Sequence, residues 1–245
     1  MNEDVYLSII IPAYNEEERI GKTLEAISSY LTRQPFNSEI IVSDGGSSDR
    51  TIEVVRQKIS QIGHLSVISR KNRGKGEGVK DGLLASRGRI RLFTDADNST
   101  DMSHFDKMRP FFDQGYEVVI CSRNPKDAPG ARQAISQAWY KRLMGNLGNL
   151  FIQLVAVRGF WDTQCGFKAY RDFAAEKIFS QQRISGWGFD IEALALARAL
   201  GYKIGVVPAY WVNDPRSHVK LSGYFQVLWE TVKVRLNFWR GKYIL

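Results

Sequence analysis

Cysteine is scarce in this sequence, with 2 residues among 245, Cys121 and Cys165. Their spacing is not that of a Cys-x-x-Cys pair, so the sequence predicts neither a zinc site nor a disulfide framework. A reducing compartment is therefore the simplest expectation. This scarcity excludes the class of small secreted domains that disulfide bonds hold together.

Long apolar runs and targeting signals are missing as well. No stretch approaches the roughly 18 apolar residues that a membrane-spanning helix requires. The first residues, Met1–Asp4, are polar and acidic and lack the basic and apolar regions of a signal peptide. We therefore expect a cytoplasmic protein whose contact with a membrane is confined to the membrane surface.

Acidic residues are in deficit, with 26 Asp and Glu against 34 Lys and Arg, a formal net charge of +8. Such a surplus favours an anionic partner, namely nucleic acid, a phosphorylated small molecule or an anionic membrane face, with a solvated basic surface as the alternative. The basic residues are scattered, and neither a helix-turn-helix nor a zinc pattern occurs, so we do not expect nucleic acid. No Walker-type or dinucleotide-type glycine loop occurs either. Phosphate neutralisation is thus left to metal and basic side chains.

Short apolar, β-branched runs alternate with helical periodicity over the first 100 residues. Buried strands are predicted at Tyr6–Ile11, Glu39–Val42, Leu65–Ile68 and Ile90–Thr94. Helices are predicted at Glu18–Leu31 and at Val79–Ala85. A third helix is predicted to begin at Asp49, which would be its N-cap. This alternation is typical of a parallel α/β sheet, and such sheets bind ligands at the carboxyl ends of their strands.

The second part of the chain continues without a linker, repeat or low-complexity segment. It is predicted to hold a strand at Val118–Ser122, a polar loop at Asn124–Gly130, a long helix at Ile135–Val157, short elements at Gly166–Tyr170, Ile191–Leu200 and Ile204–Val207, and a final segment at Leu221–Trp239. One compact domain with two functional halves accounts best for this organisation.

The sharpest local feature is Asp95-Ala96-Asp97, directly after the fourth predicted strand. Two carboxylates one residue apart can share a hard divalent cation, or one can bind metal and the other a sugar hydroxyl. Mg²⁺ and Mn²⁺ favour such oxygen ligands together with substrate phosphates. A solvated turn is the alternative for this motif taken alone.

Three further segments combine glycine with charged or aromatic residues. Arg70–Gly76 places cations among glycines, which suits a diphosphate, although a flexible basic loop has the same composition. Asp162–Lys168 and Gly186–Glu192 mix acids, aromatics and glycines, and their composition alone does not separate a site from two packed turns.

Taken together and in order, these segments resemble the family 2 inverting glycosyltransferases of the GT-A fold. The nearest likeness is to the branch of dolichyl-phosphate β-glucosyltransferases and polyprenyl-phosphate mannosyltransferases. The resemblance spans roughly residues 6–235 and rests on Ile11–Glu17, Ser43–Asp49, Asn72–Gly76, Asp95–Asp97, Cys121–Arg123, Asp162–Lys168 and Trp187–Glu192. The run Asp162–Lys168 is narrower than the others and points to the glucosyltransferase side.

At matching positions, the resemblance implies a donor site. The nucleotide base and ribose would be lined by Pro12, Tyr14, Glu16 and Asp44. Lys75 would lie near the donor diphosphate, and Asp95 and Asp97 would hold the divalent metal, Mg²⁺ or Mn²⁺, and the donor.

The resemblance implies an acceptor side too. Arg123 would grip the acceptor phosphate, and Asp162 and Asp190 would sit beside the transferred sugar, so that Asp97, Asp162, Asp190 and Arg123 form the catalytic set. The second acceptor arginine is assigned to Arg132, with Arg142 as its rival.

The chain also departs from the family pattern. The usual Asp-Asp-Gly-Ser reads Asp44-Gly45-Gly46-Ser47, so one base-reading carboxylate is missing. Asn98-Ser99-Thr100 follows Asp97, without the Gln that some mannosyltransferases carry there. UDP-glucose is the expected donor, with GDP-mannose as the alternative.

These implications define the expected organisation and function. We expect a mostly parallel, Rossmann-like GT-A sheet flanked by helices. Within one domain, 1–100 would bind the nucleotide sugar, 101–216 the acceptor, and 217–245 would form an amphipathic C-terminal helix. The expected reaction transfers a hexose, glucose or mannose, to a polyprenyl or dolichyl phosphate.

The acceptor class is not settled by the residues alone. A polyprenyl monophosphate is largely anionic at pH 7 and can attack without a general base. A hydroxyl acceptor, on a sugar or a protein, would need a base, which Asp162 or Asp190 would supply. A non-catalytic module that binds nucleotide sugar or lipid phosphate is the non-enzyme alternative.

Two apolar stripes bear on the lipid. The first runs along the long helix, at Leu143, Leu147, Leu150, Phe151 and Leu154. The second, near the C-terminus, comprises Phe225, Leu228, Val232, Leu236 and Trp239, among the cations Lys220, Lys233, Arg235, Arg240 and Lys242 and the single acid Glu230. An aromatic, basic amphipathic helix suits a membrane interface, whereas packing on the core is the alternative for both stripes. We expect peripheral binding to the cytoplasmic membrane face.

Overall fold

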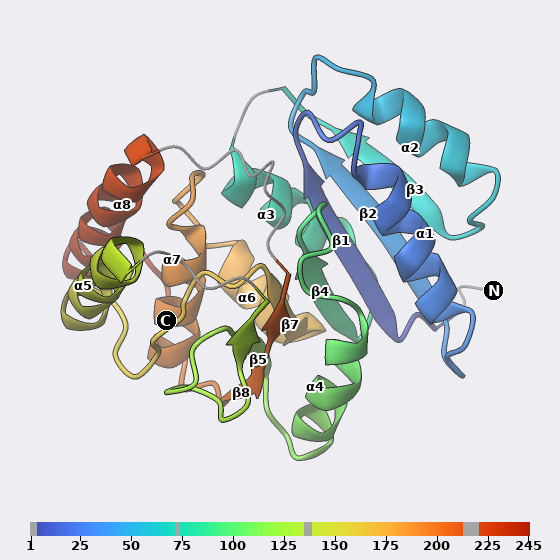
Figure 1. Ribbon diagram of the computed structural model, residues 1–245. Helices are drawn as coiled ribbons and strands as arrows, with labels where there is room; N and C mark the ends of the chain where they lie inside the picture. Colours follow the sequence, from blue (N-terminus) through green and yellow to red (C-terminus); the bar gives the residue numbers. More distant parts are fainter. Residues whose placement is uncertain (1–3, 72–73, 135–138, 213–220) are drawn as a thin grey trace.

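The computed structural model describes residues 4–71, 74–134, 139–212 and 221–245, although not the side chains of 139–144 and 221–222. In these ranges the chain folds around a seven-stranded sheet with helices on both faces (Figure 1). The strand order is β3-β2-β1-β4-β7-β5-β8, and a separate ribbon pairs β6 with β9. The strands are β1 (Leu7–Ala13), β2 (Ser38–Asp44), β3 (Leu65–Ser69), β4 (Ile90–Thr94), β5 (Val118–Ser122), β6 (Arg132–Gln133), β7 (Phe167–Arg171), β8 (Ile204–Pro208) and β9 (Tyr210–Trp211).

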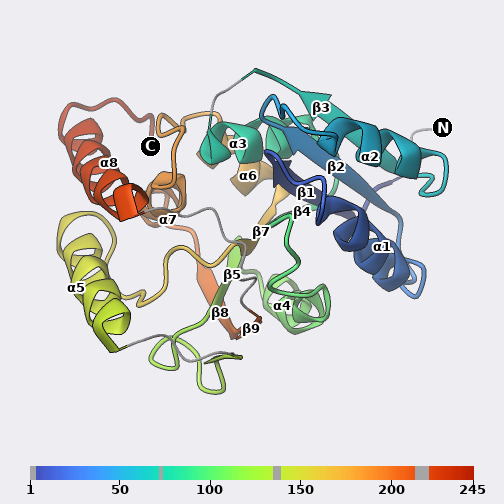
Figure 2. The same cartoon turned by 45° about the horizontal axis from the view of Figure 1, so that its top comes forward.

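Helices connect most of these strands. They are α1 (Ile20–Leu31), α2 (Thr51–Ile59), α3 (Lys75–Ala85), α4 (Ser103–Asp113), α5 (Trp139–Val155), α6 (Asp172–Phe179), α7 (Phe189–Ala199) and α8 (Leu221–Trp239). In both views α5 and α8 lie side by side at the end of the molecule away from β1 to β3 (Figures 1 and 2).

The sheet separates two apolar clusters, because alternate residues of a strand point to opposite faces. On β1, Ile9 packs with α1, α2 and α4, whereas Ile10 packs with α3 and the helices from α5 to α8. Leu92 and Phe93 divide β4 in the same way. The predicted α/β class with a mostly parallel sheet is confirmed.

One strand runs against the others. β7 lies between β4 and β5 and pairs with both in the antiparallel direction, so that Thr94 at the end of β4 faces Phe167 at the start of β7. The segment before β7 therefore meets the loop after β4 at the same edge of the sheet. The sequence predicted an element at Gly166–Tyr170 but did not give its direction.

The start of α2 differs from the sequence prediction. α2 begins at Thr51 with Arg50 as its N-cap, not at Asp49. Asp49 nevertheless accepts a hydrogen bond from the Thr51 backbone N–H at 3.0 Å, so its carboxylate still satisfies a donor of the first turn. The long helix is described from Trp139, and the predicted start at 135–138 lies outside the described residues.

The predicted C-terminal stripe is divided between core and solvent. α8 packs on the core through Thr231 and Val234, which are fully buried. Phe225 and Trp239, at the two ends of the stripe, are 67% and 70% exposed, whereas the stripe residues between them are half-buried. The helix is therefore anchored in the core and still presents aromatic rings to solvent.

The stripe on α5 is mostly exposed. Leu147, Leu150 and Leu154 face solvent and Phe151 is half-buried, whereas Ile152 packs in the core. The side chain of Leu143 lies outside the described residues. Within the described ranges, no helix has both the length and the apolar character to cross a bilayer.

The contact between α3 and β1 gives a test of the packing. A Cβ at Gly82 would collide with the Ile10 side chain, whereas a Cβ at Gly148, inside α5, would meet nothing within 4 Å. Alanine favours a helix over glycine by about 1 kcal/mol, and overpacking costs about 1–3 kcal/mol. We expect Gly148→Ala to raise the urea midpoint and Gly82→Ala to lower it. Equal midpoints for the two variants would contradict the close approach.

Candidate active site

The loops after β1 and β2 are joined by hydrogen bonds at the edge where both strands end. The Asn15 N–H donates to the Ser47 hydroxyl, and the Ser48 N–H donates to the Asn15 carboxamide, both at 2.9 Å. Asn15 itself has a φ of 55°, a left-handed conformation that asparagine tolerates better than most residues. The two loops therefore form one continuous wall.

Asp44, predicted to line the pocket for the base and ribose, is buried and bonded to its own turn and to the end of β3. It accepts hydrogen bonds from the Gly46 N–H, the Ser47 hydroxyl and the Ser69 hydroxyl, at 2.9, 2.5 and 3.1 Å. The carboxylate thus shapes the turn that follows β2. Any contact with a base or ribose would be made from this fixed position.

The other predicted nucleotide residues lie on the first loop and strand. Glu16 accepts two hydrogen bonds from the Arg19 guanidinium, each at 2.7 Å. Pro12 stands in β1 beside Ser43 of β2. The Tyr14 ring is 54% exposed, so its apolar face is open to a planar ligand.

Lys75, Asp95 and Asp97 form a charged group at the end of β4. The Lys75 ammonium lies 2.6 Å from the Asp95 carboxylate and 5.3 Å from the centre of the Trp187 ring. The Asp97 carboxylate accepts a hydrogen bond from the Ser99 N–H at 2.9 Å. Thr23 of α1 stabilises the turn between the two carboxylates, because its hydroxyl donates to the Ala96 carbonyl at 2.6 Å.

The pKa values of this group show how closely the charges are packed. Burial and then the Asp95 carboxylate raise the pKa of Asp97 above its ordinary value. Burial lowers the pKa of Lys75, but Asp95, Asp190 and Asp97 outweigh it, so that the net pKa of Lys75 is raised. The ammonium therefore stays charged, and two like-charged carboxylates are held side by side.

This donor set fits a divalent cation. A cation shared by Asp95 and Asp97 would remove the repulsion that raises the pKa of Asp97. In the described part of the chain no cluster of three or more acidic, His or Cys residues could hold an ion. Mg²⁺ is commonly bound by one or two carboxylates together with waters and substrate phosphates, so two carboxylates suffice.

The Lys75 turn has little freedom. Gly74 has a φ of 87°, and the Gly76 N–H donates to the Ser185 carbonyl at 2.8 Å. A Cβ on Gly76 would lie 2.8 Å from the Ile184 carbonyl oxygen, so only glycine fits. The segment before α7 thus fixes the lysine that faces Asp95.

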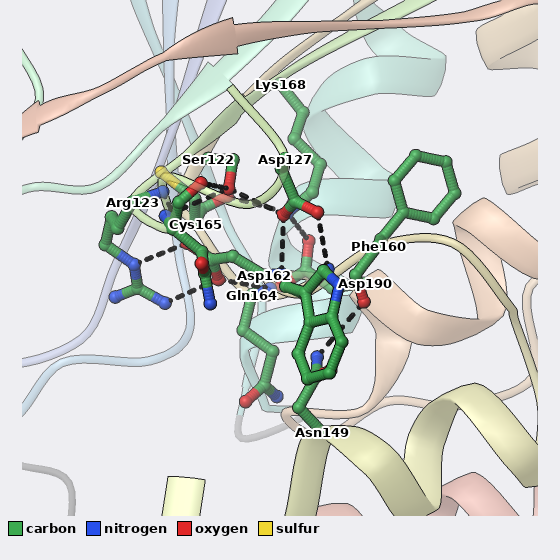
Figure 3. A network of polar contacts seen from close by, with 12 residues as sticks. Ser122, Arg123, Asp127, Asn149, Phe160, Asp162, Gln164, Cys165, Lys168 and Asp190 are labelled. Atoms are coloured by element: carbon green, nitrogen blue, oxygen red, sulfur yellow. Dashed lines mark hydrogen bonds and ion pairs between the residues drawn. The ribbon is translucent and has the colours of Figure 1, made fainter. Parts of the chain in front are cut away.

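Arg123 and Asp162, both predicted for the acceptor side, form a close ion pair (Figure 3). The Arg123 Nε and Nη2 groups donate to the two Asp162 oxygens, each at 2.8 Å, and the Arg123 backbone N–H adds a third bond at 2.8 Å. Burial raises the pKa of Asp162, but Arg123 outweighs it and holds that pKa at about 2. Asp162 is therefore a permanent counter-ion for the arginine.

Asp127 was not singled out by the sequence, yet it organises this side of the site (Figure 3). It accepts hydrogen bonds from the Ser122 hydroxyl at 2.7 Å, the Trp161 N–H at 2.7 Å and the Asp162 N–H at 2.8 Å. One carboxylate thus ties the end of β5 to the segment that carries Asp162. Its only sequence signal was its place in a polar loop after a buried strand.

Lys168 and Asp190 form the second buried pair. The Lys168 ammonium has no exposed surface and donates to Asp190 Oδ1 at 2.5 Å and to the Cys165 carbonyl at 2.6 Å. Burial raises the pKa of Asp190, whereas Lys168 and Lys75 oppose that shift. Lys168 belongs to a motif that the sequence singled out, but no role was predicted for it.

The ribbon of β6 and β9 lies beside Arg123. The Arg123 guanidinium lies 5.3 Å from the centre of the Trp211 ring, and Trp211 pairs with Gln133, next to Arg132. Arg132, the first candidate for the second acceptor arginine, is exposed. It lies on β6, which pairs with the strand that carries Trp211. The side chain of its rival, Arg142, lies outside the described residues.

The structure thus brings most of the predicted residues into one group. Asp95 links its two sides, because its carboxylate pairs with the Lys75 ammonium and packs against Gly166, four residues after Asp162. The loop residues Glu16 and Asp44 instead bond within the wall beside it.

Comparison with known proteins agrees with the geometry. Residues 8–179 match the family described as Glycosyl transferase family 2. The dolichyl-phosphate beta-glucosyltransferase of Dictyostelium discoideum is 31% identical over 252 residues, covering 98% of this chain and 76% of that protein. The human protein of the same name is 30% identical over 256 residues, covering 98% of this chain and 78% of that protein.

Solved structures share the fold. Glucosyl-3-phosphoglycerate synthase from Mycobacterium tuberculosis, in complex with Mn²⁺, UDP and glucosyl-3-phosphoglycerate, has a TM-score of 0.69 at 20% identity, covering 95% of this chain and 79% of that one. Mannosyl-3-phosphoglycerate synthase from Rubrobacter xylanophilus has a TM-score of 0.68 at 19% identity, covering 98% and 76%. The fold and the charged group at the end of β4 agree with the family match. Because that match extends over residues 8–179, this chain belongs to glycosyltransferase family 2 and is a glycosyltransferase.

Proposed function

We propose that this enzyme transfers glucose from a nucleotide sugar, UDP-glucose, to a dolichyl or other polyprenyl phosphate, with inversion at the anomeric carbon. The relatives named above support the sugar and the acceptor. The observation that carries the proposal is a pair of cations, Lys75 and Arg123. Lys75 pairs with Asp95, and Arg123 pairs with Asp162, four residues before Gly166, which packs against the Asp95 carboxylate. Donor and acceptor phosphates need two such positions on either side of one sugar.

The residues divide the reaction between them. Lys75 would bind the donor diphosphate and neutralise charge as the nucleoside diphosphate leaves. Arg123 would orient the acceptor phosphate, whose oxygen attacks the anomeric carbon. Its guanidinium has five N–H donors, and Asp162 engages two of them, so donors remain for a phosphate. Alignment of the two bound reactants contributes the remaining rate enhancement.

The acceptor needs no base, because a phosphate monoester is already largely ionised at pH 7. A hydroxyl acceptor would need a carboxylate to remove its proton. Asp162 is poorly suited to that task, because a carboxylate with a pKa of about 2 is a weak base and is paired with Arg123. Asp190 is bonded to the Lys168 ammonium. These pairings favour the phosphate acceptor.

Asp95 and Asp97 would hold a Mg²⁺ or Mn²⁺ ion. When bound, such an ion would neutralise negative charge on the donor phosphates. The glucosyl-3-phosphoglycerate synthase structure holds Mn²⁺ and UDP together, which supports a metal with a uridine nucleotide here. GDP-mannose remains the alternative donor.

We also propose that the enzyme works at the cytoplasmic face of a membrane. Exposed apolar residues gather on α5 and α8, which lie side by side (Figure 2). They are Leu147, Leu150, Leu154, Tyr224, Phe225, Trp229 and Trp239. Exposed cations on α8 accompany them, so this end suits an anionic lipid surface. In this arrangement 1–100 binds the nucleotide sugar, 101–216 the acceptor, and 217–245 the membrane.

Removing one metal-binding carboxylate tests the donor site. We expect Asp97→Ala to abolish transfer while the urea midpoint stays near that of the wild type, because the side chain makes one hydrogen bond to a backbone N–H. Chelation should stop wild-type turnover, and Mg²⁺ or Mn²⁺ should restore it. Glycolipid formation from UDP-glucose and a prenyl phosphate is the measurement. Near-normal turnover of the variant would show that Asp97 holds no metal.

Removing Arg123 tests the acceptor site. Arg123→Ala should raise KM for the prenyl phosphate about ten- to hundredfold, because an arginine–phosphate contact contributes about 1.5–3 kcal/mol, and should leave donor KM nearly unchanged. Lysine should rescue poorly, since it lacks the two-pronged geometry. Arg123→Ala with Asp162→Asn is the control, because it leaves no unpaired buried carboxylate. Equal effects on both substrates would move Arg123 to the donor side.

Charge reversal on α8 tests membrane attachment. Lys233, Arg235 and Arg240 are exposed, so changing all three to Glu should release the protein from anionic vesicles without unfolding it. Wild-type binding should weaken as salt rises. Turnover of a short, water-soluble prenyl phosphate should survive. Sedimentation of the triple variant with vesicles would assign membrane contact to another surface, and a wild type that never sediments would favour a soluble acceptor.

A further inference from the structure

A pocket outside the charged group lies between α8 and the segment before α7. Its volume is about 340 Å³, and it is lined by Arg183, Ser185, Glu230, Lys233, Arg240 and Lys242 among others. The site described above uses none of these side chains. The pocket has room for a phosphate and the polar atoms attached to it, and it is separate from the charged group.

The charges around this pocket are unbalanced. Its lining holds 4 cations, Arg183, Lys233, Arg240 and Lys242, against the single acid Glu230. That acid is buried and already engaged, because it accepts hydrogen bonds from the Gly188 N–H at 2.7 Å and from Gln226 at 2.8 Å. A bound anion would thus meet four cations against one carboxylate, so the lining carries a surplus of positive charge.

The pocket opens beside the aromatic end of the molecule. The Lys233 ammonium lies 5.7 Å from the centre of the Trp229 ring, and that ring is largely exposed. Trp239, next to Arg240, is 70% exposed. Exposed tryptophans beside cations are typical of side chains at the headgroup level of a membrane.

The back of the pocket is connected to the donor site. Ser185 lines the pocket, and its carbonyl accepts the hydrogen bond from Gly76 that fixes the Lys75 turn. Glu230 holds Gly188, one residue from the Trp187 ring that lies beside the Lys75 ammonium. A ligand in the pocket would therefore contact the segment that holds the turn of Lys75 in place.

We propose that this pocket binds the phosphate of an anionic phospholipid headgroup. The inference rests on the proposed membrane contact and adds to it a defined site for one class of lipid. The two tryptophans would enter the interface while the four cations of the pocket surround the phosphate. Free phosphate shares the recognised chemistry, so the experiment separates the two sources.

The test compares two neutralised pairs of cations on the full-length chain. Lys233→Gln with Arg240→Gln removes two cations of this pocket, whereas Arg158→Gln with Arg235→Gln removes two cations that line a separate pocket. Both lose the same charge, so a diffuse attraction would weaken equally. Sedimentation with phosphatidylcholine vesicles containing phosphatidic acid measures the Kd. We expect the pocket pair to lose about tenfold more affinity than the control pair.

Two outcomes would overturn the proposal. Equal losses in the two double variants would show that binding depends on net charge and not on a site. The thermal midpoint of the wild type is also measured with inorganic phosphate and with the vesicles. An equally large rise with both would assign the pocket to a soluble phosphate. Turnover of a short prenyl phosphate should remain normal in both double variants, so a wild type without that activity would contradict the proposed function and leave the vesicle comparison intact.

Discussion

The antiparallel insertion of β7 between β4 and β5 is the constraint on which the site depends. A parallel strand at this position would start at the opposite edge of the sheet, and its preceding segment would be far from Asp95. In the observed direction, Gly166 comes so close to the Asp95 carboxylate that a Cβ there would collide with it. Asp162, five residues before β7, is then within reach of Arg123. One reversed strand thus brings the ion pair of Arg123 and Asp162 close to the charged group of Lys75, Asp95 and Asp97.

Two ion pairs hold buried charge at the site. Arg123 with Asp162 and Lys168 with Asp190 each combine an ion pair with further hydrogen bonds to the backbone. Removing one partner of such a pair leaves an uncompensated charge, which is costly in a desolvated site. The arrangement keeps side chains of fixed charge in position around a substrate that brings several negative charges of its own.

Much of this fold was predictable from the sequence, because its signals are local. The β-branched runs of β1 and β4 and the spacing of Ile20, Leu24 and Ile27 depend only on neighbouring residues. The Asp95-Ala96-Asp97 turn was predictable for the same reason.

The direction of β7 and the roles of Asp127 and Lys168 were not predictable, since each depends on partners distant in the sequence. Asp127 bonds to Asp162, 35 residues away, and Lys168 to Asp190, 22 residues away. The stripe on α8 shows a different limit. Its periodicity indicates a helix with an apolar face but does not separate residues that pack inside from those that stay outside, such as Val234 and Trp239.

The attachment of the C-terminus has a consequence for how the molecule opens. The Tyr243 hydroxyl donates to Glu192 at 2.5 Å, and Glu192 also accepts hydrogen bonds from the backbone N–H groups of Arg183 and Ile184. Separation of α8 and the residues after it from the core would break the bond between Tyr243 and Glu192 together with the bond between Glu230 and Gly188. Amide hydrogens at 183–188 would then exchange with solvent at the same rate as those of α8. The segment behind the donor site and the last helix thus form a single cooperative unit, although more than 30 residues separate them along the chain.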